Sequence, residues 1–133
     1  MKVSTKGRYA LRMMIDIAEH DIEKRVTIKE ISERQEISIK YLEQIVQNLT
    51  RAGLLRGERG SGGGDILTKT PDQYTVGGIL RAIEGKLAPV ACLDSDTNFC
   101  ERSSQCKTLG FWKGLYKVID DYVDSVTLQD FLK

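Results

Sequence analysis

The segment ISERQEISIKYLEQIVQNL, residues 31–49, contains two stretches with helical spacing that are separated by a short polar break. Ser38 has the side chain of a helix N-cap and stands directly before the second stretch. Apolar residues then recur at intervals of three or four, at Ile39, Leu42, Ile45 with Val46, and Leu49. Gly53 follows as a natural C-terminal stop. Two helices joined by a tight turn predict a helix-turn-helix, and this arrangement decides the fold class.

The residues before this segment predict two helix starts. Thr27 opens TIKE, which is the Ser/Thr-x-x-Glu pattern of a capping box, so a short helix should begin there. Further upstream, STKGRYALRMMIDIAEH predicts an amphipathic first helix over residues 4–20, capped by Ser4 or Thr5. The apolar positions of this helix include Met13, Met14 and Ile17, and the spacing places three charged residues opposite them, Arg8, Arg12 and Asp16.

The residues after the helix-turn-helix predict a wing and two more helices. LLRGERGSGGGDILTKTP, residues 54–71, predicts a strand, a glycine-rich loop and a return strand, and YTVGGILRAIEG, residues 74–85, predicts a short helix. A last helix of about five turns has an apolar stripe at Leu109, Trp112, Leu115, Ile119, Tyr122 and Val126. Little of the chain remains to cover that stripe, so we expect a homodimer held by this helix.

The predicted fold is therefore mainly α with a small β-hairpin. It is a winged helix-turn-helix over residues 1–85, followed by a cysteine segment and a long dimerisation helix over residues 86–133. The 133 residues carry a net charge of +1 and contain no apolar run long enough to cross a bilayer, so we expect a cytoplasmic protein with no membrane contact. GSGGG lacks the Lys-Ser/Thr of a phosphate-binding loop, and no nucleophile motif or carboxylate pair predicts an enzyme.

The polar face of the third predicted helix suits the major groove of double-stranded DNA. Its side chains are Lys40, Glu43, Gln44, Gln47 and Arg51. Gln pairs with adenine, Glu accepts from the cytosine amino group, and Lys or Arg bonds guanine or phosphate. In the predicted wing, the glycines around Arg59 allow close approach to a narrow minor groove. A solvated helix face and an ordinary hairpin loop are the alternatives, but the two elements together favour DNA binding.

All three cysteines lie in CLDSDTNFCERSSQC, at Cys92, Cys100 and Cys106. In a reducing compartment such a cluster binds metal or senses redox state more often than it forms disulfides. Three thiolates within fifteen residues can hold one iron-sulfur cluster if an outside group completes it. Zinc is less favoured because the spacing lacks Cys-x2-Cys pairs, and a thiol redox switch remains as the alternative to a metal site.

Several segments together resemble the bacterial winged-helix regulators that include IscR, NsrR and CymR, and IscR-type proteins are the nearest. The segments are STKGRYALRMMIDIA, ISERQEISIKYLEQIVQNL, GLLRGERGSGGGDIL, TVGGILRAIEG and FWKGLYKVIDDYVDSVTLQDFL, so the resemblance covers essentially the whole chain. It implies that Glu43 and Gln44 read the major groove, that Arg59 acts in the wing, and that a 2Fe-2S cluster is bound by Cys92, Cys100 and Cys106.

Three positions depart from this pattern. IscR-like proteins have a histidine where this chain has Leu109, and nitric-oxide-sensing relatives have a carboxylate where it has Arg8. Family wings also usually carry an aromatic residue at the position of Asp65. The fourth cluster ligand is therefore expected to be an oxygen or nitrogen group, from Glu101, Asp94, Asp96 or His20.

These observations favour a homodimeric transcriptional regulator, acting as a repressor, whose affinity for operator DNA depends on an iron-sulfur cluster. One alternative is a regulator without a cluster, controlled by thiol oxidation or by an enzyme partner. A less favoured alternative is a small metal-binding redox protein.

Overall fold

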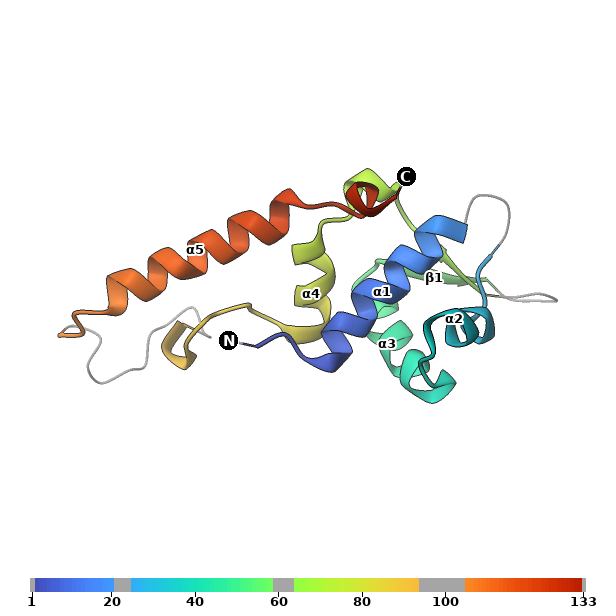
Figure 1. The fold of residues 1–133 in the computed structure, drawn as a ribbon, viewed down its shortest axis with the longest axis horizontal. Helices are drawn as coiled ribbons and strands as arrows, with labels where there is room; N and C mark the ends of the chain where they lie inside the picture. The colour runs from blue at the N-terminus through green and yellow to red at the C-terminus, as the bar shows by residue number, and fades with distance from the viewer. Residues whose placement is uncertain (1, 21–24, 59–63, 94–104, 133) are drawn as a thin grey trace.

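The computed structural model describes residues 2–20, 25–58, 64–93 and 105–132 (Figure 1). Its five α-helices and two strands within these ranges are α1 (Thr5–His20), α2 (Ile28–Gln35), α3 (Ile39–Arg51), β1 (Leu55–Glu58), β2 (Gly64–Leu67), α4 (Val76–Glu84) and α5 (Leu109–Ser125). Short 3-10 helices are η1 (Pro71–Gln73), η2 (Ala91–Leu93) and η3 (Leu128–Phe131). The predicted fold class, mainly α with a small β-hairpin, is confirmed. No helix in the described ranges is long and apolar enough to cross a membrane.

The helix-turn-helix follows from local signals that the sequence already carries. The Thr27 hydroxyl accepts from the Glu30 amide at 3.2 Å, and the Glu30 carboxylate accepts from the Thr27 amide at 3.1 Å, which completes the predicted capping box. The turn after α2 passes through Glu36 in the left-handed region, with φ of 56°. Ser38 then caps α3 by accepting from the Tyr41 amide at 3.2 Å.

The end of α3 leads directly into the wing. Gly53 has φ of 77°, and the Leu54 amide donates to the Leu49 carbonyl at 2.9 Å, so the helix closes with a Schellman motif. β1 and β2 pair antiparallel, with Leu55 opposite Leu67. Val26 adds a bridge on the other side of β2 through hydrogen bonds with Asp65 of 2.9 and 3.3 Å. A Cβ on Gly64 would lie 2.6 Å from the Val26 carbonyl oxygen, so this approach requires glycine.

One main core holds α1, α2, α3 and the base of the wing together. Its fully buried members come from α1, α2, α3, α4 and the chain end, namely Ala10, Met13, Met14, Ile17, Ile31, Leu42, Ile45, Leu49, Ile79 and Leu128, and Leu55 at the base of the wing is 2% exposed. Leu128 lies after α5 in the chain, and its amide donates to the Tyr74 carbonyl at 3.0 Å. The C-terminal segment therefore returns to the core of the winged helix-turn-helix.

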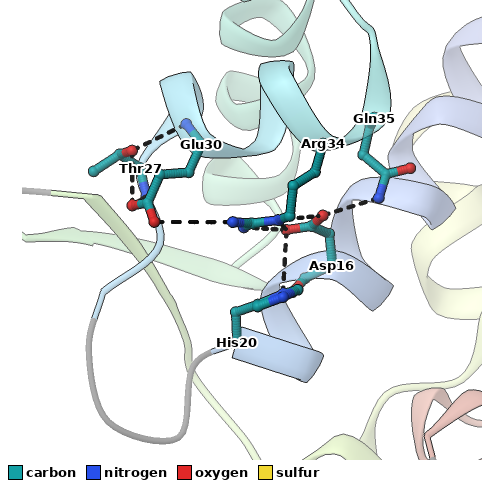
Figure 2. A network of polar contacts seen from close by, with 6 residues as sticks. All are labelled: Asp16, His20, Thr27, Glu30, Arg34 and Gln35. Carbon is teal, nitrogen blue, oxygen red and sulfur yellow. Dashed lines mark hydrogen bonds and ion pairs between the residues drawn. The ribbon is translucent and has the colours of Figure 1, made fainter.

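A buried carboxylate fixes α1 against α2 (Figure 2). Asp16, which the sequence placed on the polar face, is only 2% exposed, so that expectation is wrong. Its carboxylate accepts from the Arg34 guanidinium at 2.6 and 3.0 Å and from the Gln35 side-chain amide at 2.9 Å. The side-chain hydrogen bond between Arg34 and Asp16 is the main cause of the raised pKa of Arg34. A charge can occupy this position because every polar neighbour is a donor.

The helix α5 projects from the body and contacts it mainly through α4 (Figure 1). Arg81 of α4 forms ion pairs of 2.7 Å with both Asp120 and Asp124. Beneath them, a Cβ on Gly77 would overlap the ends of the Asp124 and Arg81 side chains and would lie 2.9 Å from a Val123 methyl, so a larger residue here would displace these ion pairs. The Val76 amide also donates to the Val126 carbonyl at 2.8 Å. These contacts attach the C-terminal half of α5 to the winged helix-turn-helix.

The Asp16–Arg34 pair predicts an asymmetric response to mutation. Arg34→Met should cost about 3–5 kcal/mol, because it leaves the buried Asp16 charge uncompensated. Asp16→Asn should cost less, about 1.5–3 kcal/mol, because the Arg34 side chain is 32% exposed and can turn to water. Urea unfolding of both variants measures the difference, and the double variant Asp16→Leu/Arg34→Met should recover part of the loss. Equal losses in the two single variants would contradict this account.

The burial of Asp65 predicts that its contribution to folding stability decreases as pH rises, whereas the contribution of most acidic residues increases. It is 7% exposed, and burial raises the pKa of its carboxyl. Above the ordinary Asp pKa of about 4, the folded state therefore binds more protons than the unfolded state, so this contribution falls as pH rises. Asp65→Asn should raise the melting temperature at pH 7, and the gain should shrink toward pH 4. A gain that is constant over this range would contradict the prediction.

Candidate nucleic-acid interface and cysteine segment

The five predicted reading residues all lie exposed on one side of α3, away from the core. They are Lys40, Glu43, Gln44, Gln47 and Arg51. The opposite side buries Leu42, Ile45 and Leu49 completely. Within the ranges that the structure describes, no hydrogen bond or ion pair engages these five side chains. Their donors and acceptors are therefore available to a ligand. Because base edges offer donors and acceptors in fixed patterns, such a mixed stripe is suited to base reading.

The start of α3 is held by contacts to its neighbours rather than by the helix alone. The Ser32 hydroxyl donates to the Ile37 carbonyl at 2.6 Å, which closes the turn. From α1, the Arg12 guanidinium donates to the backbone carbonyl and side-chain oxygen of Gln35, the latter at 3.1 Å. These contacts fix the angle between the two helices of the motif. A helix that reads DNA needs such a fixed angle, because base contacts depend on its position in the groove.

A second support joins α1 directly to α3. The rings of Tyr9 and Tyr41 meet edge to face with centroids 5.6 Å apart, and the Arg12 guanidinium lies 5.2 Å from the Tyr9 centroid. The sequence placed Arg12 among the charged residues of α1 and gave Tyr41 no role. The spacing carried no signal for their contact, since Tyr9 and Tyr41 belong to different helices.

The base of the wing is closed by one buried hydroxyl. Tyr74 is 1% exposed, and its hydroxyl donates to the Leu54 carbonyl at 2.8 Å. The same oxygen accepts from the Thr68 amide at 2.7 Å and the Lys69 amide at 3.2 Å. The residues just before β1 and just after β2 are thus tied to a single atom. Arg59, the residue predicted to act in the wing, lies outside the described residues.

The cysteine segment begins and ends at the opposite end of the molecule from the wing (Figure 1). Cys92 lies in η2, and Cys106 lies three residues before α5; both side chains are half-buried. The Cys106 sulfur is 3.3 Å from the Thr108 hydroxyl. Cys100 lies outside the described residues, as do three of the predicted fourth ligands, Asp94, Asp96 and Glu101. Among the described residues, no three His, Cys, Asp or Glu side chains are grouped as metal ligands would be.

His20, the other predicted fourth ligand, lies far from the thiols of its own chain. It is the last residue of α1, at the end that points toward the wing side of the molecule (Figure 1). Its Nδ1 is 2.8 Å from the Asp16 carbonyl oxygen and 3.7 Å from the Asp16 carboxylate (Figure 2). Within one subunit His20 therefore belongs to the α1–α2 network and not to the cysteine segment.

The donor chemistry of the segment still suits an iron-sulfur cluster. Thiolates are the preferred ligands of such clusters, and neither Cys92 nor Cys106 is used in a disulfide. Cys92 lies within η2 and Cys106 lies three residues before α5, so helical elements flank the segment on both sides.

Comparisons with known proteins agree with this architecture. The sequence model of the Rrf2 family, described as iron-dependent transcriptional regulators, matches residues 3–133. The HTH-type transcriptional regulator IscR of Erwinia tasmaniensis is 36% identical over 132 residues, which cover 99% of this chain and 79% of that protein. The structure of CymR, the global cysteine regulator of B. subtilis, superimposes with a TM-score of 0.80 at 35% identity, covering 98% of this chain and 95% of that one.

IscR of T. potens superimposes with a TM-score of 0.75 at 38% identity, covering 98% of this chain and 85% of that one. The predicted resemblance to the regulators IscR, NsrR and CymR is therefore confirmed, as is the expectation that the protein is not an enzyme. An exposed, capped α3 beside a wing is the part of the fold that a DNA-binding regulator requires. The chain belongs to the Rrf2 family of transcriptional regulators.

Proposed function

We propose that the protein is a homodimeric repressor that reads operator DNA with α3 and responds to a cluster held by its cysteines. The observation that carries the DNA-reading part is the stripe on α3, whose polar groups are free and whose helix is fixed at both ends. Glu43 and Gln44 would contact base edges, while Lys40, Gln47 and Arg51 would contact bases or phosphates. Arg59 would enter the adjacent minor groove from the wing.

The proposed dimer rests on the outer face of α5. Phe111, Val118 and Tyr122 are 65%, 63% and 68% exposed, and no residue of α5 is buried within the described chain. The other side of the helix packs Ile119 and Val123 against α4. An apolar face of this size on a projecting helix is suited to the same helix of a second copy. A dimer would present two α3 helices to half-sites about one helical turn apart, with strong salt dependence.

The proposed cofactor is a 2Fe-2S cluster held by Cys92, Cys100 and Cys106, and the cluster would supply the redox and oxygen sensitivity of the regulator. An oxygen or nitrogen group would complete it, from the loop itself or from His20 of the partner subunit. The likeness to CymR supports the alternative of a regulator without a cluster. An absorption spectrum of protein purified without oxygen separates the two. A thiolate-to-iron band in the visible range supports the cluster, and a colourless, metal-free protein with reducible thiols supports the alternative.

The proposed coupling runs through the joint between α4 and α5. Residues 86–133 would sense and residues 1–85 would read, and the Arg81 ion pairs with Asp120 and Asp124 connect the two regions. A change at Cys106 would act on the start of α5, whose far end is fixed to α4. A rotation of α5 would thus change the separation of the two α3 helices in a dimer. The protein would need a coupling free energy of about 1–3 kcal/mol between the sites.

Gln44→Ala tests the reading role. The variant should lose about 1–3 kcal/mol on the cognate operator and should lose base preference at one position of each half-site, because an amide that pairs with adenine is removed. Fluorescence anisotropy on cognate and random duplexes measures both affinities. Gln129→Ala provides the matched control, since Gln129 is an exposed glutamine in η3, away from α3. Equal losses on cognate and random DNA would remove Gln44 from the reading set.

The triple variant Cys92→Ala/Cys100→Ala/Cys106→Ala tests the sensing role. It should show no visible absorption band, should remain dimeric, and should bind a panel of operators with one fixed set of affinities. Wild-type protein should shift between two sets, with and without the cluster, because a ligand changes an equilibrium only through its different affinity for the two states. Identical affinities of the loaded wild type and the variant for every operator would end the sensor proposal, even if a cluster were present.

A further inference from the structure

One apolar side chain breaks the polar character of the reading surface. Ile39, the first residue of α3, is 46% exposed, although its spacing with Leu42, Ile45 and Leu49 predicted a place in the core. That prediction is wrong for Ile39 alone. The remaining large exposed apolar side chains of the described chain are Phe111, Val118, Tyr122 and Phe131, all on α5 or η3. Ile39 is therefore an apolar group on the DNA-binding half that the dimer proposal does not explain.

The backbone holds Ile39 outward by fixed geometry. Ile37, two residues earlier, points into the core and is 4% exposed. Between them, Ser38 accepts from the Tyr41 amide with its side chain and from the Leu42 amide at 3.0 Å with its carbonyl. Both bonds set the first turn of α3. A β-branched side chain in a helix has one strongly preferred rotamer, so Ile39 presents a stiff apolar surface.

Its position places this surface at the edge of the reading stripe. Residues four apart on a helix lie about 40° apart around the axis, so Ile39 neighbours Glu43 on the same side. Ile39 also lies at the helix N-terminus, the part of a recognition helix that contacts base edges. Neither the core nor the partly buried shell around it includes Ile39. A single apolar group at such a position meets base edges rather than protein.

We infer that Ile39 contacts the 5-methyl group of a thymine in each half-site and is a specificity-determining residue for DNA binding. This rests on the proposed reading role of α3. The chemistry selects the thymine because its methyl is the apolar feature of the major groove, whereas the other base edges present donors and acceptors. A cytosine at that position would leave its amino group against an apolar side chain without a partner.

Removing the methyl group from DNA tests the contact without changing the protein. A duplex selected by the wild-type protein from random sequence is resynthesised with deoxyuridine in place of each thymine in turn, symmetrically in both half-sites. At one position, the affinity of the wild-type protein should fall about fourfold for each methyl lost. At the other positions, its affinity should hardly change. Ile39→Ala should bind the unmodified duplex more weakly and show no further loss at that position. Ile39→Val, which keeps the branched Cβ, should retain the sensitivity.

Lys40→Ala is the control on the neighbouring residue, because loss of a charged contact should weaken binding while leaving the methyl sensitivity intact. Thermal melting of each variant checks that the fold is unchanged. The inference is overturned if no thymine is methyl-sensitive in the wild type, if Ile39→Ala keeps the same sensitivity, or if the selected half-site contains no thymine. Failure of the wild type to select any sequence would overturn the proposed function itself.

Discussion

The hydrogen-bonded ion pair between Asp16 and Arg34 is the contact on which the geometry of the helix-turn-helix depends. It joins the C-terminal part of α1 to the last turn of α2, and Gln35 adds a further donor to the same carboxylate. Because Asp16 is almost fully buried, the pair is satisfied only when α2 sits at one angle to α1. Arg12 lies one turn before Asp16 in α1, and its contact with Gln35 helps to fix the same angle. The helix-turn-helix is thus held by directional polar contacts as well as by its core.

Because the angle between α1 and α2 is fixed, α1 connects the two ends of the molecule. The face that includes Tyr9, Arg12 and Asp16 supports α2 and α3, while α1 also packs along α4, which in turn carries α5. Figure 1 shows β1 of the wing and the start of α5 at opposite ends of this arrangement. The proposed cysteine site and the proposed reading surface are therefore connected by packed helices, from α5 through α4 and α1 to α3. Such a route supports coupling, although only a measured difference between two states establishes it.

The helix boundaries were predictable because their causes are local. Thr27 with Glu30, and Ser38, bond backbone groups within a few residues, and Gly53 adopts a positive φ, so these residues specify where helices begin and end whatever surrounds them. The exposed stripe of α3 was predictable for the same reason. Asp16 and Ile39 were assigned to the wrong environments, because helical spacing places a residue on a face but does not state which neighbour covers that face.

The sequence by itself determined the order of elements, the reading helix, the wing and the family to which the chain belongs. Only the tertiary structure decided that Asp16 is buried against Arg34, that Tyr74 closes the wing, and that Arg81 joins α4 to α5. The partners in these contacts are 18, 20 and 39 residues apart. Whether a charge or a hydroxyl finds its partner at such separations depends on the packing of whole elements, which periodicity and capping patterns do not encode.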